Sequence, residues 1–183
     1  KITQHIGYTN TNLFVDNQTY HIDFVDSSQS TIGLQNKATI INNFYYTLQN
    51  TRVINPFDVS FNFQHNDQFG KASATLNYAI TVQKNNTLDI RVFAGAFVFK
   101  NQNLKQDYRF RMSGFNGPQD YLFDYNYAGR NESNGVGFAQ MVEKDGAFKV
   151  WTPLGQTSKW LVAVNIKSPK VGKLPFKLYA DIG

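Results

Sequence analysis

The sequence of 183 residues contains no cysteine, which excludes a disulfide scaffold and any metal or redox site built on thiolates. Charged residues make up only 17% of the chain, against about 25% in an average soluble protein. No apolar run approaches the roughly 18 residues that a transmembrane helix requires. The net charge of +5 is spread along the chain rather than clustered, so we expect no nucleic-acid-binding surface.

Motifs that carry catalytic or metal chemistry are also missing. The three histidines, His5, His21 and His65, lack metal-ligand spacing, and neither H-E-x-x-H nor G-x-S-x-G occurs. Asp120 and Asp124 could be imagined as paired carboxylates for glycoside hydrolysis, but that chemistry needs a cleft and a defined separation. The pattern instead favours a loop for Asp120 and a strand for Asp124. We therefore expect no catalytic residue, metal site or cofactor in this chain.

Aromatic residues are abundant, at 15% of the chain, although the mean hydropathy is only −0.40. This combination is typical of strands with one apolar face and one polar, uncharged face. The clearest example is Lys71–Gln83, where apolar residues alternate with polar ones and only Ala79 breaks the polar set. Its length exceeds the about 5–6 residues of an ordinary strand and reaches the roughly 9–11 residues of a membrane-spanning strand.

The same alternation recurs along the chain, and turn residues separate the runs. It predicts strands in these segments: 59–63, 88–98, 108–112, 123–127, 160–166 and 176–182. Residues 38–48 are ambiguous, but their β-branched and aromatic side chains favour a strand. We read 100–107 and 128–137 as loops. The expected fold is all-β: an antiparallel up-and-down transmembrane β-barrel of about 10–12 strands, with residues 1–183 as a single domain.

Alternation alone does not decide which face meets water. A soluble barrel or sandwich buries its apolar face, whereas an outer-membrane barrel turns that face to lipid and its polar face to the lumen. Long strands, few charges and aromatic residues near strand ends favour the membrane. The alternative is a soluble β-barrel or β-sandwich that binds a hydrophobic ligand or a carbohydrate.

The membrane hypothesis assigns each face by residue. We expect a polar set to face the lumen, where buried charges must be paired: Lys71, Ser73, Thr75, Asn77, Asp89, Arg91, Arg109, Arg111, Asp124, Lys149, Lys167, Lys177 and Asp181. We expect an apolar set to face lipid: Leu76, Tyr78, Ile80, Val82, Ile90, Val92, Val162, Val164, Ile166, Phe176 and Leu178. We expect an aromatic girdle at the membrane interfaces: Tyr45, Phe57, Phe69, Tyr125, Tyr127, Trp151 and Trp160.

Several segments also resemble a known family. They are Phe69–Tyr78, Leu88–Phe97, Gly117–Tyr125 with Gly129 and Arg130, Asp145–Val150, Lys159–Lys167 and Gly172–Gly183. Together they resemble the C-terminal β-barrel region of large outer-membrane proteins of Bacteroidota that are related to the M1 (aminopeptidase-type) metallopeptidases. The resemblance covers roughly two-thirds of the chain, and it consists of strand patterns rather than a catalytic signature.

The resemblance implies a membrane anchor or scaffold in the outer membrane of a Gram-negative bacterium. Its expected partners are the lipid bilayer and, beyond it, other outer-membrane proteins or the assembly machinery. The zinc-binding H-E-x-x-H of the family has no match, so a metallopeptidase activity would belong to a portion of the parent protein outside this chain. The ending Tyr179–Gly183 lacks the usual closing aromatic residue, so we expect a fragment of a larger protein that lacks one or more final strands.

Overall fold

The computed structural model describes residues 1–13, 18–26, 29–36, 39–84, 86–102, 104–113, 120–122, 124, 127–131, 139–150, 154–170 and 176–183. Within these residues the fold is all-β, apart from one short 3-10 helix, η1 (Gln106–Tyr108). In this part of the chain no helix is long and apolar enough to cross a membrane.

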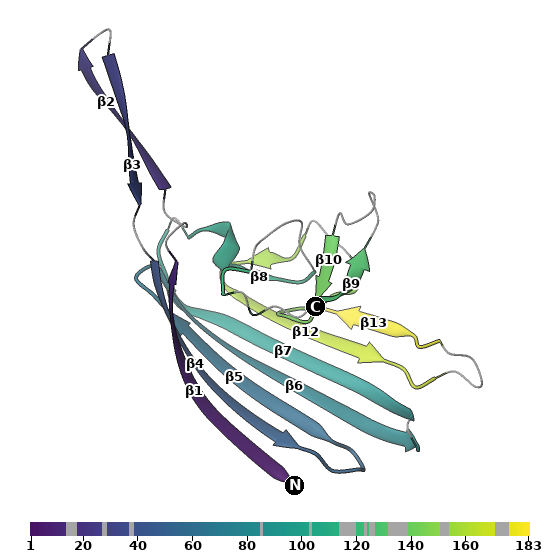
Figure 1. The fold of residues 1–183 in the computed structure, drawn as a ribbon. Helices are drawn as coiled ribbons and strands as arrows, with labels where there is room; N and C mark the ends of the chain where they lie inside the picture. Colours follow the sequence, from purple (N-terminus) through teal and green to yellow (C-terminus); the bar gives the residue numbers. More distant parts are fainter. Residues whose placement is uncertain are drawn as a thin grey trace.

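Seven antiparallel strands form the main sheet, in the order β1-β4-β5-β6-β7-β12-β13 (Figure 1). The strands are β1 (Ile2–Leu13), β4 (Thr39–Asn50), β5 (Phe57–His65), β6 (Phe69–Gln83), β7 (Asn86–Lys100), β12 (Trp160–Lys167) and β13 (Tyr179–Ile182). β1 and β13 are the two edges of the sheet. The described residues therefore form an open sheet, and the predicted closed barrel is not found among them.

Three pairs of strands lie outside the main sheet. β2 (Gln18–Asp26) and β3 (Gln29–Asn36) form a hairpin between β1 and β4 that projects beyond the long strands in Figure 1. β8 (Phe110–Arg111) pairs with β11 (Gln156–Thr157), and β9 (Tyr127–Asn131) pairs with β10 (Ala139–Val142). β8 to β11 lie on the same side of the main sheet (Figure 1).

The alternation of β6 explains how the sheet is built. In antiparallel strands, directly opposed residues share a face. Leu76 lies opposite Val92 of β7, while Asn77 lies opposite Arg91. Apolar residues are thus matched with apolar residues on one face and polar residues with polar residues on the other. A shift of one residue would reverse both faces, so the alternation fixes the register.

The core lies between the main sheet and an inner layer, which we define as residues 104–113, 120–122 and 143–150. One cluster packs Tyr108 and Leu104 against Ile41 and Phe69. The other packs Phe110 against β7 and β12, with these buried residues: Phe93, Leu161 and Ala163. We call the sheet face under the inner layer the inner face, and the opposite face the outer face. Phe93 interrupts the polar alternation of β7 because the inner layer packs on it.

Most strand predictions are confirmed. The segments 59–63, 71–83, 88–98 and 160–166 lie within β5, β6, β7 and β12, and the ambiguous 38–48 lies largely in β4. The antiparallel all-β class is also confirmed. In the segment 176–182, only the last four residues form a strand, β13.

Two segments differ from the prediction. Residues 108–112 were expected to form a barrel strand, but only Phe110–Arg111 is a strand, and it pairs with β11 in the inner layer. The reason is that Tyr108 and Phe110 are apolar enough to be buried beneath the main sheet rather than within it. The expected loop at 128–137 is wrong for its first residues, because β9 continues to Asn131. Most of the segment 123–127 lies outside the described residues.

Candidate functional site

The outer face of the main sheet carries no Lys, Arg, Asp or Glu over four successive rows of paired residues. Each row crosses the sheet from β1 toward β12 or β13. The rows are Tyr8-Phe44-Phe63-Ala72-Ala96-Trp160, Ile6-Tyr46-Phe61-Ala74-Ala94-Val162, Gln4-Leu48-Val59-Leu76-Val92-Val164-Ile182 and Ile2-Asn50-Phe57-Tyr78-Ile90-Ile166-Ala180. An uncharged, largely apolar surface that crosses a whole sheet is unusual for a soluble monomer, whose largest exposed apolar patch covers about 300–600 Å².

Large apolar side chains of this face are open to the surroundings. Ile6 is 86% exposed, Trp160 67% and Phe61 51%. Their exposure does not come from the edges alone, because Phe61 lies on β5, a central strand. Within the described residues, the inner layer covers only the opposite face, so nothing in this part of the chain buries these side chains.

The inner face carries the opposite chemistry. One row of polar residues crosses all seven strands: Thr3-Gln49-Asp58-Asn77-Arg91-Asn165-Asp181. Asn77 Nδ2 donates to Asp58 Oδ2 at 2.8 Å, and Asn165 Nδ2 donates to Asp181 Oδ1 at 2.8 Å. From Asp58 to Asp181, hydrogen bonds between side chains of neighbouring strands thus satisfy polar groups of this row.

The same row holds the turn of the inner layer at 144–146. Arg91 Nη1 donates to the carbonyl oxygen of Asp145 at 2.7 Å, and Asn165 Nδ2 donates to that of Gly146 at 2.9 Å. The backbone N–H of Arg111 donates to Asp145 Oδ2 at 3.1 Å. Burial raises the pKa of the Asp145 carboxyl, although nearby cations oppose this shift.

Lys71 fixes the inner layer at a second point. Its Nζ atom donates to the carbonyl oxygen of Tyr108 at 3.3 Å. Three aromatic rings surround the same atom, with centroids 5.1 Å away for Tyr121, 5.3 Å for Phe110 and 5.6 Å for Phe69. The ammonium group is thus held by one hydrogen bond and by cation–π contacts.

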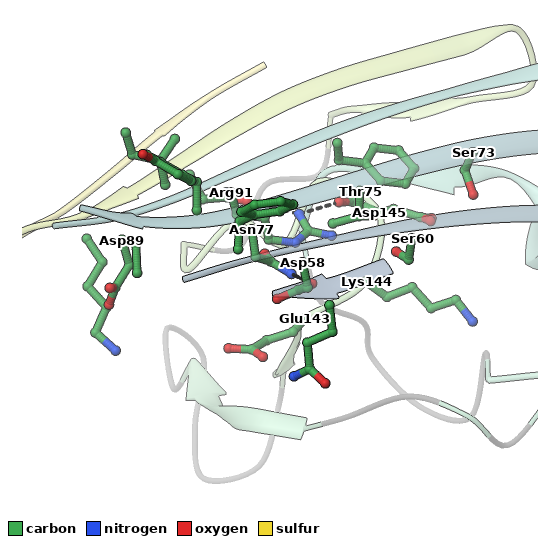
Figure 2. A pocket seen from close by; sticks show the side chains of 18 of the residues that line it. Asp58, Ser60, Ser73, Thr75, Asn77, Asp89, Arg91, Glu143, Lys144 and Asp145 are labelled. Carbon is green, nitrogen blue, oxygen red and sulfur yellow. Dashed lines mark hydrogen bonds between the residues drawn. The ribbon is translucent and has the colours of Figure 1, made fainter. Parts of the chain in front are cut away.

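A cavity of about 1190 Å³ lies on the inner face beside the turn at 144–146. Figure 2 shows side chains of β5, β6 and β7 around it, with Glu143, Lys144 and Asp145 of the inner layer on another side. The wall contributed by β5 and β6 consists mainly of hydroxyl and amide side chains, among them Ser60, Ser73 and Thr75. The cavity is large enough for a drug-sized or oligomeric ligand.

Most of the predicted lumen-facing residues share the inner face. They are Lys71, Ser73, Thr75, Asn77, Asp89, Arg91, Lys167 and Asp181. The others lie beside the main sheet rather than in it. Arg109, Arg111 and Lys149 belong to the inner layer, Asp124 accepts a hydrogen bond from Lys144, and Lys177 lies 3.8 Å from Asp89. Arg109 and Arg111 were expected on a sheet strand, and that placement is wrong because their segment folds inward.

The predicted lipid-facing residues that are paired in strands all fall on the outer face. They are Leu76, Tyr78, Ile80, Ile90, Val92, Val162, Val164 and Ile166. Val82 lies at the register shift between Thr81 and Gln83 and is 55% exposed. Phe176 and Leu178 precede β13 and are 65% and 67% exposed.

The structure places the residues of the predicted aromatic girdle on different faces of the sheet. Phe57 and Trp160 lie on the outer face. Tyr45 lies on the inner face, because its neighbours Phe44 and Tyr46 occupy the outer one, and Phe69 is fully buried against Tyr108. The girdle assignment is therefore wrong for Tyr45 and Phe69. Tyr125 and Trp151 lie outside the described residues, and Tyr127 begins β9 without a described side chain.

Sequence reasoning missed the residues that join the two layers. Asn165 and Asp145 were not selected, because an amide within a strand and a turn of the form Lys-Asp-Gly are common features. One available signal was the interrupted alternation of β7, where Phe93 and Phe97 fall on the polar face. An apolar patch within a polar face indicates that another segment packs there.

No family model, curated protein or solved structure matches this chain. The distribution of charge between the two faces is therefore the feature on which a functional argument depends.

Proposed function

We propose that this chain is part of an outer-membrane β-barrel that serves as a membrane anchor or scaffold. The domain that it would anchor is a metallopeptidase domain outside this chain. The observation that carries the proposal is the outer face, which has no charged side chain in four rows across the sheet. A Lys or Arg on the lipid face of a barrel costs about 2–4 kcal/mol at the midplane. Lipid contact would therefore explain why charge is missing there.

Strand length also supports this function. β6 and β7 have 15 residues each, and β1 and β4 have 12 each. Tilted membrane strands need about 9–11 residues, so each of these four strands is long enough to cross the hydrocarbon core. In water, by contrast, exposed side chains such as Ile6 and Phe61 would favour aggregation.

The inner face fits the wall of a lumen that is partly filled rather than open along its length. Its charged groups contact neighbouring segments: Asp89 pairs with Lys177, and Arg91 donates to the carbonyl oxygen of Asp145 in the inner layer. The inner layer is packed on β7 and β12 by a buried cluster that includes Phe110. We therefore favour an anchor or scaffold over an open diffusion pore.

Closure of this barrel requires strands beyond the seven of the main sheet. The smallest outer-membrane barrels have about eight strands, and both β1 and β13 have one unpaired edge among the described residues. In the proposal, further strands of the same protein pair with these edges.

The soluble alternative requires the opposite distribution of charged and apolar residues between the two faces. A soluble barrel or sandwich places charged residues outside and apolar residues inside. In the main sheet the charged residues of β6, β7 and β12, such as Lys71, Arg91 and Lys167, lie on the inner face. This distribution favours the membrane proposal.

Extraction of the parent protein from bacterial membranes tests the proposal. We expect it to remain in the outer-membrane fraction after high-salt and carbonate washes and to be released by detergent. We also expect heat-modifiable migration in SDS gels, because a closed barrel stays folded in SDS until it is boiled. Release of the protein by salt alone, in a monodisperse form without detergent, would overturn the proposal in favour of the soluble alternative.

A further inference from the structure

Four neutral polar side chains form a block in the middle of the inner face. Asn62 of β5 lies opposite Ser73 of β6, and Ser60 lies opposite Thr75. All four line the cavity and are half-buried. None of them makes a side-chain hydrogen bond within the part of the chain that the structure describes. Four adjacent donors and acceptors are therefore available to a ligand in the cavity.

The charged groups around the cavity are largely engaged elsewhere. Arg91 donates to Asp145 and Asn165, and Lys144 pairs with Asp124. The carboxylate of Asp58 accepts a hydrogen bond from Asn77 at Oδ2, and within the described residues no contact is found for Oδ1. Arg52 and Glu143 also line the cavity, and both are exposed residues of opposite charge. Around the block itself the available groups are hydroxyls, an amide and one carboxylate oxygen, which together match the hydroxyl groups of an uncharged ligand better than a phosphate or a cation.

From these observations we propose that the inner face binds a neutral saccharide. Asn62, Ser73, Ser60 and Thr75 provide hydrogen bonds to its hydroxyl groups, and Asp58 accepts a further one. This site does not depend on membrane insertion, since all of its residues lie on the opposite face of the sheet from the proposed lipid surface.

Isothermal titration calorimetry on the purified parent protein tests this site. The detergent should be an amine oxide, because the headgroup of a glucoside detergent would compete. The probes are neutral hexasaccharides of α- and β-linked glucose and of mannose, and the charged counterpart of equal length is hexagalacturonate. We expect saturable binding of at least one neutral probe and weaker binding of the acidic one.

Variants then locate the site. Thr75→Val and Asn62→Ala each remove a hydrogen-bonding group and should weaken binding of the neutral probe about tenfold. Thr9→Val is the matched control, because Thr9 lies on the same face but on edge strand β1, away from the cavity. It should change the affinity by less than about twofold. Circular dichroism confirms that each variant keeps its strand content.

Three results would overturn the saccharide site. They are no heat of binding for any neutral probe up to about 10 mM, tighter binding of hexagalacturonate than of the neutral probes, or equal effects of Thr75→Val and Thr9→Val. A protein that proves soluble without detergent yet binds the neutral probe would overturn the membrane proposal and leave this site intact.

Discussion

Arg91 and Asn165 are joined across β7 and β12 by a 3.0 Å hydrogen bond from Arg91 Nη1 to Asn165 Oδ1. Both side chains also reach the inner layer, where Arg91 donates to the carbonyl oxygen of Asp145 and Asn165 to that of Gly146. The pair therefore couples the wall of the sheet to the turn that covers it. These contacts help to hold the inner layer on the sheet.

Replacement of Asn165 by leucine should release the inner layer before it unfolds the sheet. Asn165 is buried, so the change leaves the carbonyl oxygen of Gly146 and a donor of Arg91 without a partner, at a cost of about 1–3 kcal/mol each. Urea denaturation followed by hydrogen exchange should show faster exchange in residues 143–150 than in β6. The control is Thr47→Val, because this inner-face hydroxyl has no hydrogen bond to any described residue, and the change should alter stability by less than about 0.5 kcal/mol. Uniform loss of protection in both regions would contradict the coupling.

Attachment of the inner layer should depend on pH through Asp145. Burial raises the pKa of this carboxyl above its ordinary 3.8, while Lys71, Lys144 and the backbone N–H of Arg111 oppose the rise. A raised folded-state pKa gives a stability contribution that is full below the ordinary value and is lost as pH rises through the folded-state value. Thermal unfolding between about pH 4 and pH 8 should therefore show a falling melting temperature in the wild type.

Asp145→Asn isolates this effect. The amide stays neutral at every pH and can still accept the hydrogen bond from Arg111, so its pH profile should be flatter than that of the wild type. Parallel profiles for the two proteins would exclude Asp145 as the titrating group.

Gly95 should be intolerant of any side chain. A Cβ atom at this position would lie 2.7 Å from Phe110 Cζ and 3.0 Å from Phe93 Cζ, and Phe110 is only 1% exposed. Gly95→Ala should therefore cost about 1–3 kcal/mol through overpacking. In a Phe110→Leu background the same change should cost less, because the ring that it meets is gone. A full double-mutant cycle by chemical denaturation measures the difference, and additive effects would show that Phe110 does not limit the space.

A charge on the outer face separates the membrane proposal from the soluble alternative. Phe61→Lys places an ammonium group in the middle of the uncharged rows and should reduce insertion into lipid vesicles, at a cost of about 2–4 kcal/mol near the bilayer midplane. Gln49→Lys is the control, since Gln49 is exposed on the inner face. If both variants fold equally well and Phe61→Lys is the more soluble without lipid, the outer face is a water-exposed surface.

Local alternation determined much of this fold from the sequence. It placed Lys71–Gln83 in one long strand and separated Leu76 from Asn77 onto opposite faces, because successive side chains of a strand point in opposite directions. The same rule predicted β5, β7 and β12. It also indicated that charge would be confined to one face, which the rows of paired residues in the main sheet bear out.

Prediction from alternation was wrong where the position of a segment depends on which other segment it packs against. Tyr108, Phe110 and Met112 alternate with polar residues as a sheet strand would, yet this segment folds into the inner layer. Alternation is a local property, and it does not say whether a segment extends a sheet or packs on top of one. The same limit explains Phe69, whose burial depends on Tyr108, a residue distant in the sequence.

By itself, the sequence determined the long strands β5, β6, β7 and β12 and the two faces of each, because both follow from the two-residue repeat of an extended chain. The tertiary structure alone decided the order of the strands, the placement of the inner layer and the meeting of Arg91 with Asn165 and Asp145. These contacts join residues up to 74 positions apart. They form only when the inner layer packs on the apolar residues around Phe93, and no local pattern in the sequence predicts that packing.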